Sequence, residues 1–132
     1  MTKLNMSNTE QDAIKQVIEK AYIQGIHTSQ DESEVKSGFH PDFAMLVLQK
    51  GKMEKVDVDL WLERVESMKA DNPEMWKAET TYTFDMIDIA GPAAMAKLNV
   101  YKGTVHFSTD YMLLYKFEDS WKIVSKIFSV PQ

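Results

Sequence analysis

Apolar positions recur at helical spacing near the start of the chain. The stripe that they form consists of Ile14, Val17, Ile18, Ala21 and Tyr22. Polar and charged residues occupy the opposite positions, which predicts an amphipathic helix. Ser7 and Glu10 match the pattern of a capping box, so we expect this helix to begin at Ser7, after a flexible segment over residues 1–6. Gly25 is its predicted end.

A second amphipathic helix is predicted between Asp57 and Asn72. Its apolar face consists of Val58, Trp61, Leu62, Val65 and Met68. Charged residues lie on the opposite face of this helix. The sequence Asn72-Pro73 is expected to end it, because the residue before a proline is disfavoured in helical backbone.

Three short features are expected between the two helices. Residues 31–36 form a single helical turn. Residues 39–43 form a corner, because Pro41 fixes its own φ and disfavours helical backbone at the residue before it. Residues 43–49 form a buried strand, which ends at a turn over residues 50–52.

From Trp76 onward the apolar period is two, which is typical of strands. Four strands are predicted, over residues 76–89, 94–102, 107–117 and 121–130. A slip in the alternation at Ile87 and Ile89 indicates either a β-bulge or a stretch that is covered on both faces. Helices followed by a run of strands predict an α+β fold, with the helices on one face of a strongly curved antiparallel sheet.

The last two strands are apolar on both of their faces. We assign one parity to the helix-covered face: Phe107, Tyr111, Leu113, Tyr115 and Phe117. The other parity is expected on an outer face that a second copy of the chain covers, which predicts a homodimer. The residues of this expected outer face are Met112, Leu114, Val124 and Phe128. The turn over residues 118–120 allows two registers, which leaves the face of Trp121 open.

Length, charge and cysteine content exclude several classes of protein. The chain has 132 residues, which predicts one domain over residues 1–132. Its net charge is −5, whereas a nucleic-acid-binding domain needs a basic surface. It has no cysteine, no apolar run near the ~18 residues of a membrane span, and no apolar signal-peptide region. We expect a cytoplasmic protein whose partners are neither nucleic acids nor membranes.

The sequence holds few patterns that specify chemistry. Its three histidines, His27, His40 and His106, are 13 and 66 residues apart and form no metal-ligand pair. There is no glycine-rich phosphate loop and no serine-nucleophile motif, so we expect neither a metal nor a cofactor. Acid–base chemistry in an enclosed apolar pocket remains, because burial lets a tyrosine or a carboxylic acid donate a hydrogen bond to a developing oxyanion.

Three segments give the chain a resemblance to a known superfamily. They are residues 39–43 (Phe-His-Pro-Asp-Phe), 109–116 (Thr-Asp-Tyr-Met-Leu-Leu-Tyr-Lys) and 121–128 (Trp-Lys-Ile-Val-Ser-Lys-Ile-Phe). In their order and spacing the chain resembles the nuclear transport factor 2-like superfamily, and within it the SnoaL-like and lumazine-binding groups. The resemblance implies a cystatin-like cone, in which a curved antiparallel sheet wraps around the first helix. It also implies an apolar cavity at the wide end and a homodimer through the outer face of the sheet.

Within this superfamily, ketosteroid isomerase places a tyrosine on the first helix and an acid on a late strand. The resemblance implies that Tyr22 and Asp110 occupy these places. The aspartate base of that enzyme lies on the strand after the corner, where residues 43–48 hold no carboxylate. A steroid-isomerase reaction is therefore not expected. His40 is the remaining acid or base candidate, because histidine titrates near neutral pH.

The superfamily includes isomerases, dehydratases, polyketide cyclases, ligand binders and interaction domains, so the fold alone does not give a function. We expect a domain that binds a small apolar or aromatic molecule in a pocket with its mouth near His40. The residues predicted to line the pocket are Tyr22, Phe39, Trp61, Tyr82, Phe84 and Tyr111. One alternative is an acid–base enzyme of isomerase, dehydratase or polyketide-cyclase type that uses Tyr22, His40 and Asp110. The other is a dimeric interaction module whose cone is filled.

Each catalytic candidate also has a purely structural interpretation. Tyr22 lies on an apolar stripe and fits the core. Asp110 shares the parity of Leu114 and fits the outer face or solvent. His40 fits a cap of the turn at Pro41. The volume of the pocket and the directions of these side chains distinguish the interpretations.

Overall fold

The computed structural model describes residues 3–131, and side chains within residues 9–131. A π-helix, η1, continues the first helix without a break. The elements in chain order are α1 (Lys3–Ile18), η1 (Glu19–Ser29), α2 (Glu32–Lys36), β1 (Phe39–Gln49), β2 (Lys52–Val56), α3 (Val58–Asp71), α4 (Pro73–Lys77), β3 (Thr80–Ala90), β4 (Ala93–Lys102), β5 (Val105–Phe117) and β6 (Ser120–Ser129).

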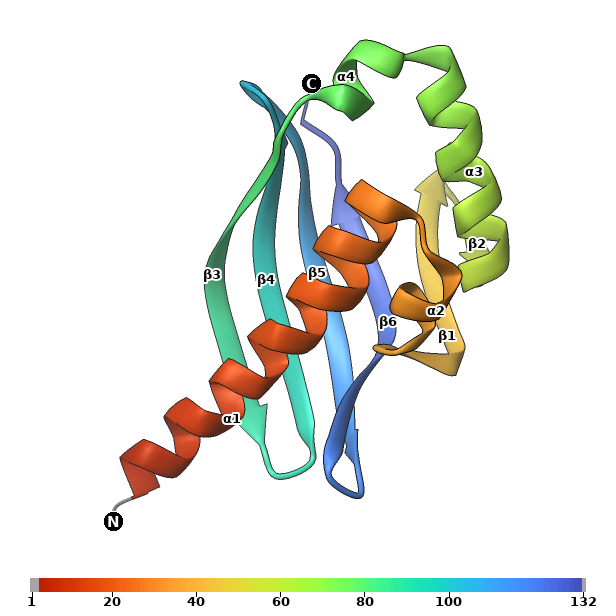
Figure 1. Cartoon of the computed structure of the whole chain (residues 1–132). Coiled ribbons are helices and arrows are strands. Elements are labelled where there is room, and N and C mark those ends of the chain that lie inside the picture. The colour runs from red at the N-terminus through yellow and green to blue at the C-terminus, as the bar shows by residue number, and fades with distance from the viewer. Residues whose placement is uncertain (1–2, 132) are drawn as a thin grey trace.

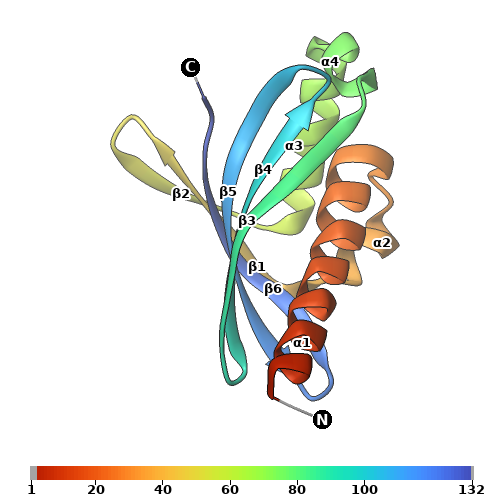
Figure 2. The ribbon, with the colours of Figure 1, turned by 90° about the vertical axis from the view of Figure 1, so that its left-hand side faces the viewer.

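The strands of the described chain form one sheet in the order β2-β1-β6-β5-β4-β3. Neighbours are antiparallel, except that β1 and β6 are parallel. The expected antiparallel sheet thus contains one parallel pair, whose strands are far apart in the chain and joined by no hairpin. All the helices lie on one side of the curved sheet, and α1 runs obliquely across it (Figures 1 and 2). The predicted cone-shaped α+β fold is confirmed.

The first helix is longer at both ends than predicted. It begins at Lys3 instead of Ser7. The side chain of Ser7, which the capping box involves, and residues 1–2 lie outside the described part of the structure. It ends at Ser29 instead of Gly25, and Gln30 follows in left-handed backbone with φ 54°. Gly25 serves packing, because a Cβ there would lie 2.8 Å from Val35 Cγ2 of α2.

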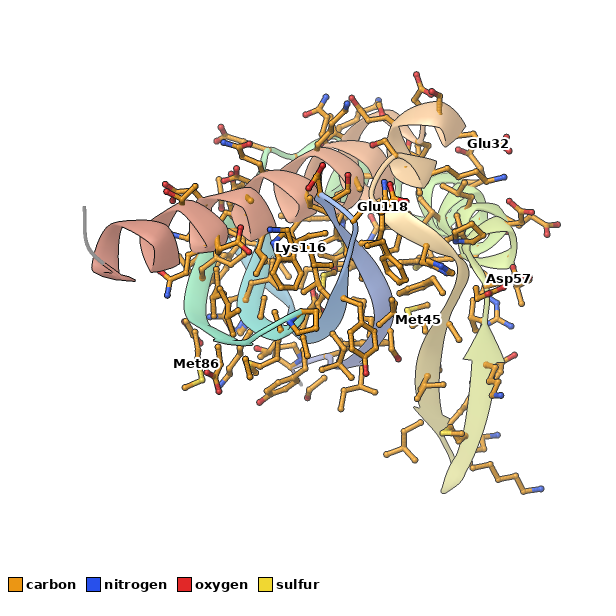
Figure 3. The ribbon with its side chains drawn as sticks, turned by 90° about the horizontal axis from the view of Figure 1, so that it is seen from below. Glu32, Met45, Asp57, Met86, Lys116 and Glu118 are labelled. Carbon is orange, nitrogen blue, oxygen red and sulfur yellow. The ribbon has the colours of Figure 1, made fainter. Side chains whose placement is uncertain are left out.

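The second helix matches its prediction, and Asp57 caps it by accepting a hydrogen bond from the backbone N–H of Leu60. The predicted corner at residues 39–43 is instead the start of β1, where the pairing with β6 is irregular. Strand β2 was not predicted. The β1–β2 hairpin extends away from the rest of the molecule (Figure 3). Trp76 lies in α4 and not in a strand, because Asn72 and Pro73 start a new helical turn.

The bulge predicted near Ile87 is confirmed, since the β3–β4 register shifts between Phe84 and Met86. The predicted assignment of the two faces of β5 is wrong. Met112 and Leu114 are buried under the helices, whereas the alternate residues of β5 face outward and are exposed. These outward residues are Tyr111, Leu113, Tyr115 and Phe117.

Both faces of β5 are apolar, so the neighbouring strand β4 determines which face of β5 lies under the helices. Ala94 and Ala96 of β4 are small, buried and paired with Leu114 and Met112. Such small side chains leave room for a helix to approach the sheet. Phe128 also faces inward, Val124 is half-buried beside a register shift, and Trp121 is buried on the inner side.

Candidate ligand-binding site

A cavity of about 410 Å³ lies between η1, α3 and α4 and the inner face of the sheet. This volume lies within the range of small-molecule sites. Its apolar wall consists of Ile26, Met45, Val47, Trp61, Val65, Met68, Trp76, Phe107, Phe128 and Val130. Met68 and Val130 are both more than a third exposed and lie at its mouth.

The secondary structure explains how the wall is assembled. Trp61, Val65 and Met68 are spaced by four and three residues on α3, which places them on one face. Lys126 and Phe128 are two residues apart on β6, so both face inward. On η1, hydrogen bonds of π-helical type bring residues five apart close together, which aligns Tyr22 with His27.

Tyr22, Asp110 and Lys126 form a buried polar centre beside the cavity. Tyr22 Oη donates a hydrogen bond to Asp110 Oδ2 over 2.5 Å. Lys126 Nζ lies 3.5 Å from the other oxygen, Oδ1, and the two side chains are 4% and 0% exposed. Burial, and then the charge of Asp110, raise the pKa of Tyr22 well above its usual range. Tyr22 therefore stays protonated and can act as a hydrogen-bond donor.

The Lys126 ammonium is enclosed mainly by aromatic rings. Its Nζ lies 4.1 Å from the ring centroid of Phe128 and 5.1 Å from that of Trp61. It also lies 5.4 Å from the ring centroid of Tyr22 and 3.7 Å from the thioether of Met45. Burial lowers the pKa of Lys126, and the Asp110 carboxylate opposes this shift only in part.

His27 is another of the polar side chains that line the cavity. It is buried between the rings of Tyr22, Trp76 and Phe107. Neither ring nitrogen has a hydrogen-bond partner within the described residues. Burial, followed by the charges of Lys102 and Lys126, lowers the pKa of His27 well below its usual range. The imidazole is therefore neutral at pH 7 and offers one donor and one acceptor.

Lys102 is a second buried cation, but it does not line the cavity. Its Nζ lies 3.9 Å from the ring centroid of Trp76 and donates a hydrogen bond to Thr80 Oγ1 over 3.1 Å. Burial lowers the pKa of Lys102 to about 8. Trp76 thus separates Lys102 from the Lys126 side of the site.

The structure brings together two of the three predicted catalytic residues, Tyr22 and Asp110. His40 lies elsewhere, in a depression of about 220 Å³ that Phe39 also lines. Its Nδ1 accepts a hydrogen bond from the backbone N–H of Asp42, and its ring stacks on Phe117. The mouth of the cavity is therefore not near His40.

Of the six residues predicted to line the pocket, Tyr22 and Trp61 do so, and Phe39, Tyr82, Phe84 and Tyr111 do not. Tyr82 and Phe84 contact each other on β3, and Tyr82 Oη donates a hydrogen bond to Glu19 over 2.6 Å. Tyr111 is on the outer face, where Lys97 lies over its ring.

Sequence reasoning missed His27, Trp76, Phe107 and Lys126. A helical wheel of ordinary α-helical period places His27 away from Tyr22, because it ignores the π-helix. For Lys126, the one available signal is its position two residues before Phe128 in an alternating strand. Lysine is rarely buried, so this signal alone does not single out Lys126.

The described residues contain no cluster of three or more side chains suited to a metal ion. None of the helices within residues 3–131 combines the length and apolarity that crossing a membrane requires.

Known structures share this fold. A protein from Silicibacter pomeroyi, described as NTF-2 like and of unknown function, has a TM-score of 0.76 and 18% identity over 99% of this chain and 100% of that one. An NTF2-like protein of unknown function from Shewanella baltica has a TM-score of 0.72 and 23% identity over 100% and 98% of the two chains. A Caulobacter vibrioides protein with a cystatin-like fold has a TM-score of 0.61 and 17% identity over 92% and 89%.

No curated protein matches the chain. The model of one protein family, described as "Putative lumazine-binding", matches residues 9–129, which is most of the sequence. The family match and the NTF2-like structures agree with the resemblance seen in the sequence. The chain belongs to this lumazine-binding family of the nuclear transport factor 2-like superfamily.

Proposed function

We propose that the cavity binds a small organic molecule with a flat apolar body and one oxygen-bearing polar end. The observation that carries the proposal is a pair of buried polar atoms on the cavity wall, the two ring nitrogens of His27, which have no hydrogen-bond partner within the described residues. A buried polar group left unpaired costs about 1–3 kcal/mol. A ligand that pairs with these atoms recovers that cost.

The remaining wall defines the chemistry of the ligand. The rings of Trp61, Trp76 and Phe107 favour a flat aromatic or conjugated body. The Lys126 ammonium favours an oxygen at the polar end, neutral or anionic. Contacts of this kind support an affinity of roughly micromolar, near −8 kcal/mol.

A blocking experiment tests the proposal. Met68 lies at the mouth and Met53 lies on the distant β1–β2 hairpin, and both are exposed. Calorimetric titration with naphthoate and naphthalenemethanol measures binding to the wild-type protein, Met68→Trp and Met53→Trp. We expect Met68→Trp to weaken binding at least about tenfold, and Met53→Trp to leave it within about twofold. Equal affinity in all three proteins contradicts the assignment of the site.

Acid–base catalysis is a second candidate function, and the Tyr22–Asp110–Lys126 centre favours it. Tyr22 supplies a protonated hydroxyl, and Asp110 is a carboxylate held by that hydroxyl beside the cavity. His40 has no part in this version, because it lies in a different depression. Exchange of α-protons of a bound ketone into deuterated water, lost in Asp110→Asn, tests this candidate.

We also propose that the protein forms a homodimer through the outer face of the sheet. Support comes from Leu113, Tyr115 and Ile127, which are each about half exposed on adjacent strands. The adjacent residues Leu113 and Leu114 provide a matched test, because they point to opposite faces. Leu113→Glu should give a folded monomer of 15.2 kDa by light scattering, whereas Leu114→Glu should unfold the protein. A wild-type protein that is monomeric at micromolar concentration contradicts this proposal.

A further inference from the structure

Lys126 carries a primary amine into the wall of the cavity, and its surroundings are unusual for a lysine. The side chain is 4% exposed, and Nζ lies 4.1–5.4 Å from the ring centroids of Phe128, Trp61 and Tyr22. The distance of 3.5 Å to Asp110 Oδ1 exceeds the usual 2.7–2.9 Å of a charge-assisted hydrogen bond. Within the part of the chain that the structure describes, the amine therefore has no short hydrogen bond.

The side chain of Asp110 faces this amine and is held in place by Tyr22. Tyr22 holds Oδ2 through its hydroxyl, which leaves Oδ1 directed toward Lys126 Nζ. Oδ1 has no hydrogen-bond partner within the described residues. The carboxylate is thus fixed and buried, and the oxygen that faces the amine forms the 3.5 Å ion pair with it.

We propose that Lys126 forms a Schiff base with an aldehyde or ketone that enters the cavity. This inference rests on the proposed binding function and names the class of ligand more closely: a flat apolar molecule whose polar end is a carbonyl group. The aromatic wall holds the body of the ligand, and the carbonyl carbon lies against Nζ. Amines enclosed in apolar pockets are activated for this reaction, because burial favours their neutral form.

The step is balanced with groups that the site already holds. The Lys126 ammonium gives a proton to Asp110 Oδ1, and the free amine attacks the carbonyl carbon. The carbonyl π electrons move to oxygen, which takes the proton from Asp110 to give a protonated carbinolamine. This nitrogen passes one proton to Asp110, which delivers it to the hydroxyl. Water leaves, and the nitrogen lone pair forms the C=N bond of a protonated imine, so no oxidant or reductant is consumed.

Lys102 is the other buried lysine and serves as the internal comparison. Burial lowers the pKa of Lys102 as well, but its Nζ is directed to Trp76 and Thr80 and does not line the cavity. Within the described residues, no carboxylate forms an ion pair with Lys102. Reaction at Lys126 in preference to Lys102 therefore reports on the cavity and not on burial alone.

Reductive trapping tests the inference on the full chain. The protein is incubated with naphthaldehyde and cyanoborohydride, and mass spectrometry of peptides locates each added naphthylmethyl group. We expect Lys126 to be labelled at least about tenfold faster than exposed lysines, because burial favours its free amine whereas exposed lysines stay protonated. Lys126→Arg should lose this label, Lys102→Arg should keep it, and excess naphthalenemethanol should suppress it.

The outcomes separate this inference from the proposed function. Naphthalenemethanol binds without forming an imine, so its calorimetric titration reports binding alone. If it binds and the wild-type protein gains no label at Lys126, or gains it at Lys102 instead, the Schiff-base inference is wrong and the binding function stands. If it does not bind and no label forms, both are wrong. The peptide map of the wild-type protein decides between these results even if a variant fails to fold.

Discussion

The two ends of the space between the helices and the sheet differ in composition. Toward the β3–β4 and β5–β6 turns, α1 covers the sheet (Figure 1). The apolar side chains there, such as Ile14 and Ile18 of α1 and Ile123 of β6, are fully buried. Toward the other end, η1, α3 and α4 enclose a cavity whose wall includes buried Lys126 and His27. The continuous helical segment thus begins, as α1, over a filled apolar core and ends, as η1, beside the cavity.

This difference separates stability from function. Filling a core with well-packed apolar groups stabilises a fold, whereas a void and unpaired polar atoms cost stability. Natural proteins depart from complete packing and pairing mainly at functional sites. The end of the cone with the cavity is therefore the place to look for function, and substitutions at the two ends should behave differently.

The largest expected effect comes from breaking the buried ion pair. Lys126→Met leaves the Asp110 carboxylate buried without its cation, which should lower the free energy of unfolding by about 3–5 kcal/mol at pH 7. Urea unfolding measures this loss. Lys126→Met combined with Asp110→Asn removes both charges and should recover most of it. A Lys126→Met protein within about 1 kcal/mol of the wild type contradicts the buried pair.

The comparison of the two ends is sharpened by Ile18 and Ile26, two buried isoleucines of one continuous helical segment. Ile18→Ala creates a new void in a filled core and should cost about 4 kcal/mol. Ile26 already borders the cavity and has fewer contacts to lose, so Ile26→Ala should cost about 2 kcal/mol. Ile26→Ala should also alter naphthoate affinity, which Ile18→Ala should not. Equal costs in urea unfolding argue that the cavity is filled.

Two tyrosine hydroxyls give a smaller, matched effect. Tyr22→Phe leaves Asp110 Oδ2 unpaired in a fully buried place and should cost about 2 kcal/mol. Tyr82 donates to Glu19 in a partly exposed place, and this bond raises the pKa of Tyr82 to about 12. Solvent can replace that bond, so Tyr82→Phe should cost less than about 1 kcal/mol. The reverse order in thermal unfolding refutes the buried hydrogen bond.

The smallest effect is the pH dependence of stability that His27 produces. Its pKa is lower in the folded than in the unfolded protein, because burial, Lys102 and Lys126 oppose its charge. The unfolded chain therefore binds a proton first as the pH falls, and stability is lost below about pH 6.5. Relative to His27→Phe, the wild type should lose no more than about 1.4 kcal/mol per pH unit between pH 6.5 and 5. Parallel pH profiles for the two proteins contradict a buried neutral histidine.

The fold was predictable from the sequence because its signals are local. The stripe of α3, the strand alternation and the bulge near Ile87 each depend on neighbouring residues. The site was only partly predictable, because it depends on distant pairs: Tyr22 and Asp110 are 88 residues apart. The pairing of β5 with β4 and β6 determines the side of the sheet on which Asp110 lies. Both faces of β5 are apolar, so no local pattern could predict which face lies under the helices.

The central claim is that a ligand occupies the hollow end of the cone, and the three tryptophan indoles test it directly. Trp61 and Trp76 line the cavity, whereas Trp121 is buried at the start of β6, away from it. In a nitrogen–proton NMR titration of the full chain with naphthalenemethanol, the indole signals of Trp61 and Trp76 should shift in a saturable way, and that of Trp121 should stay in place. A saturable shift confined to Trp121, or no shift at any of the three, would contradict the claim.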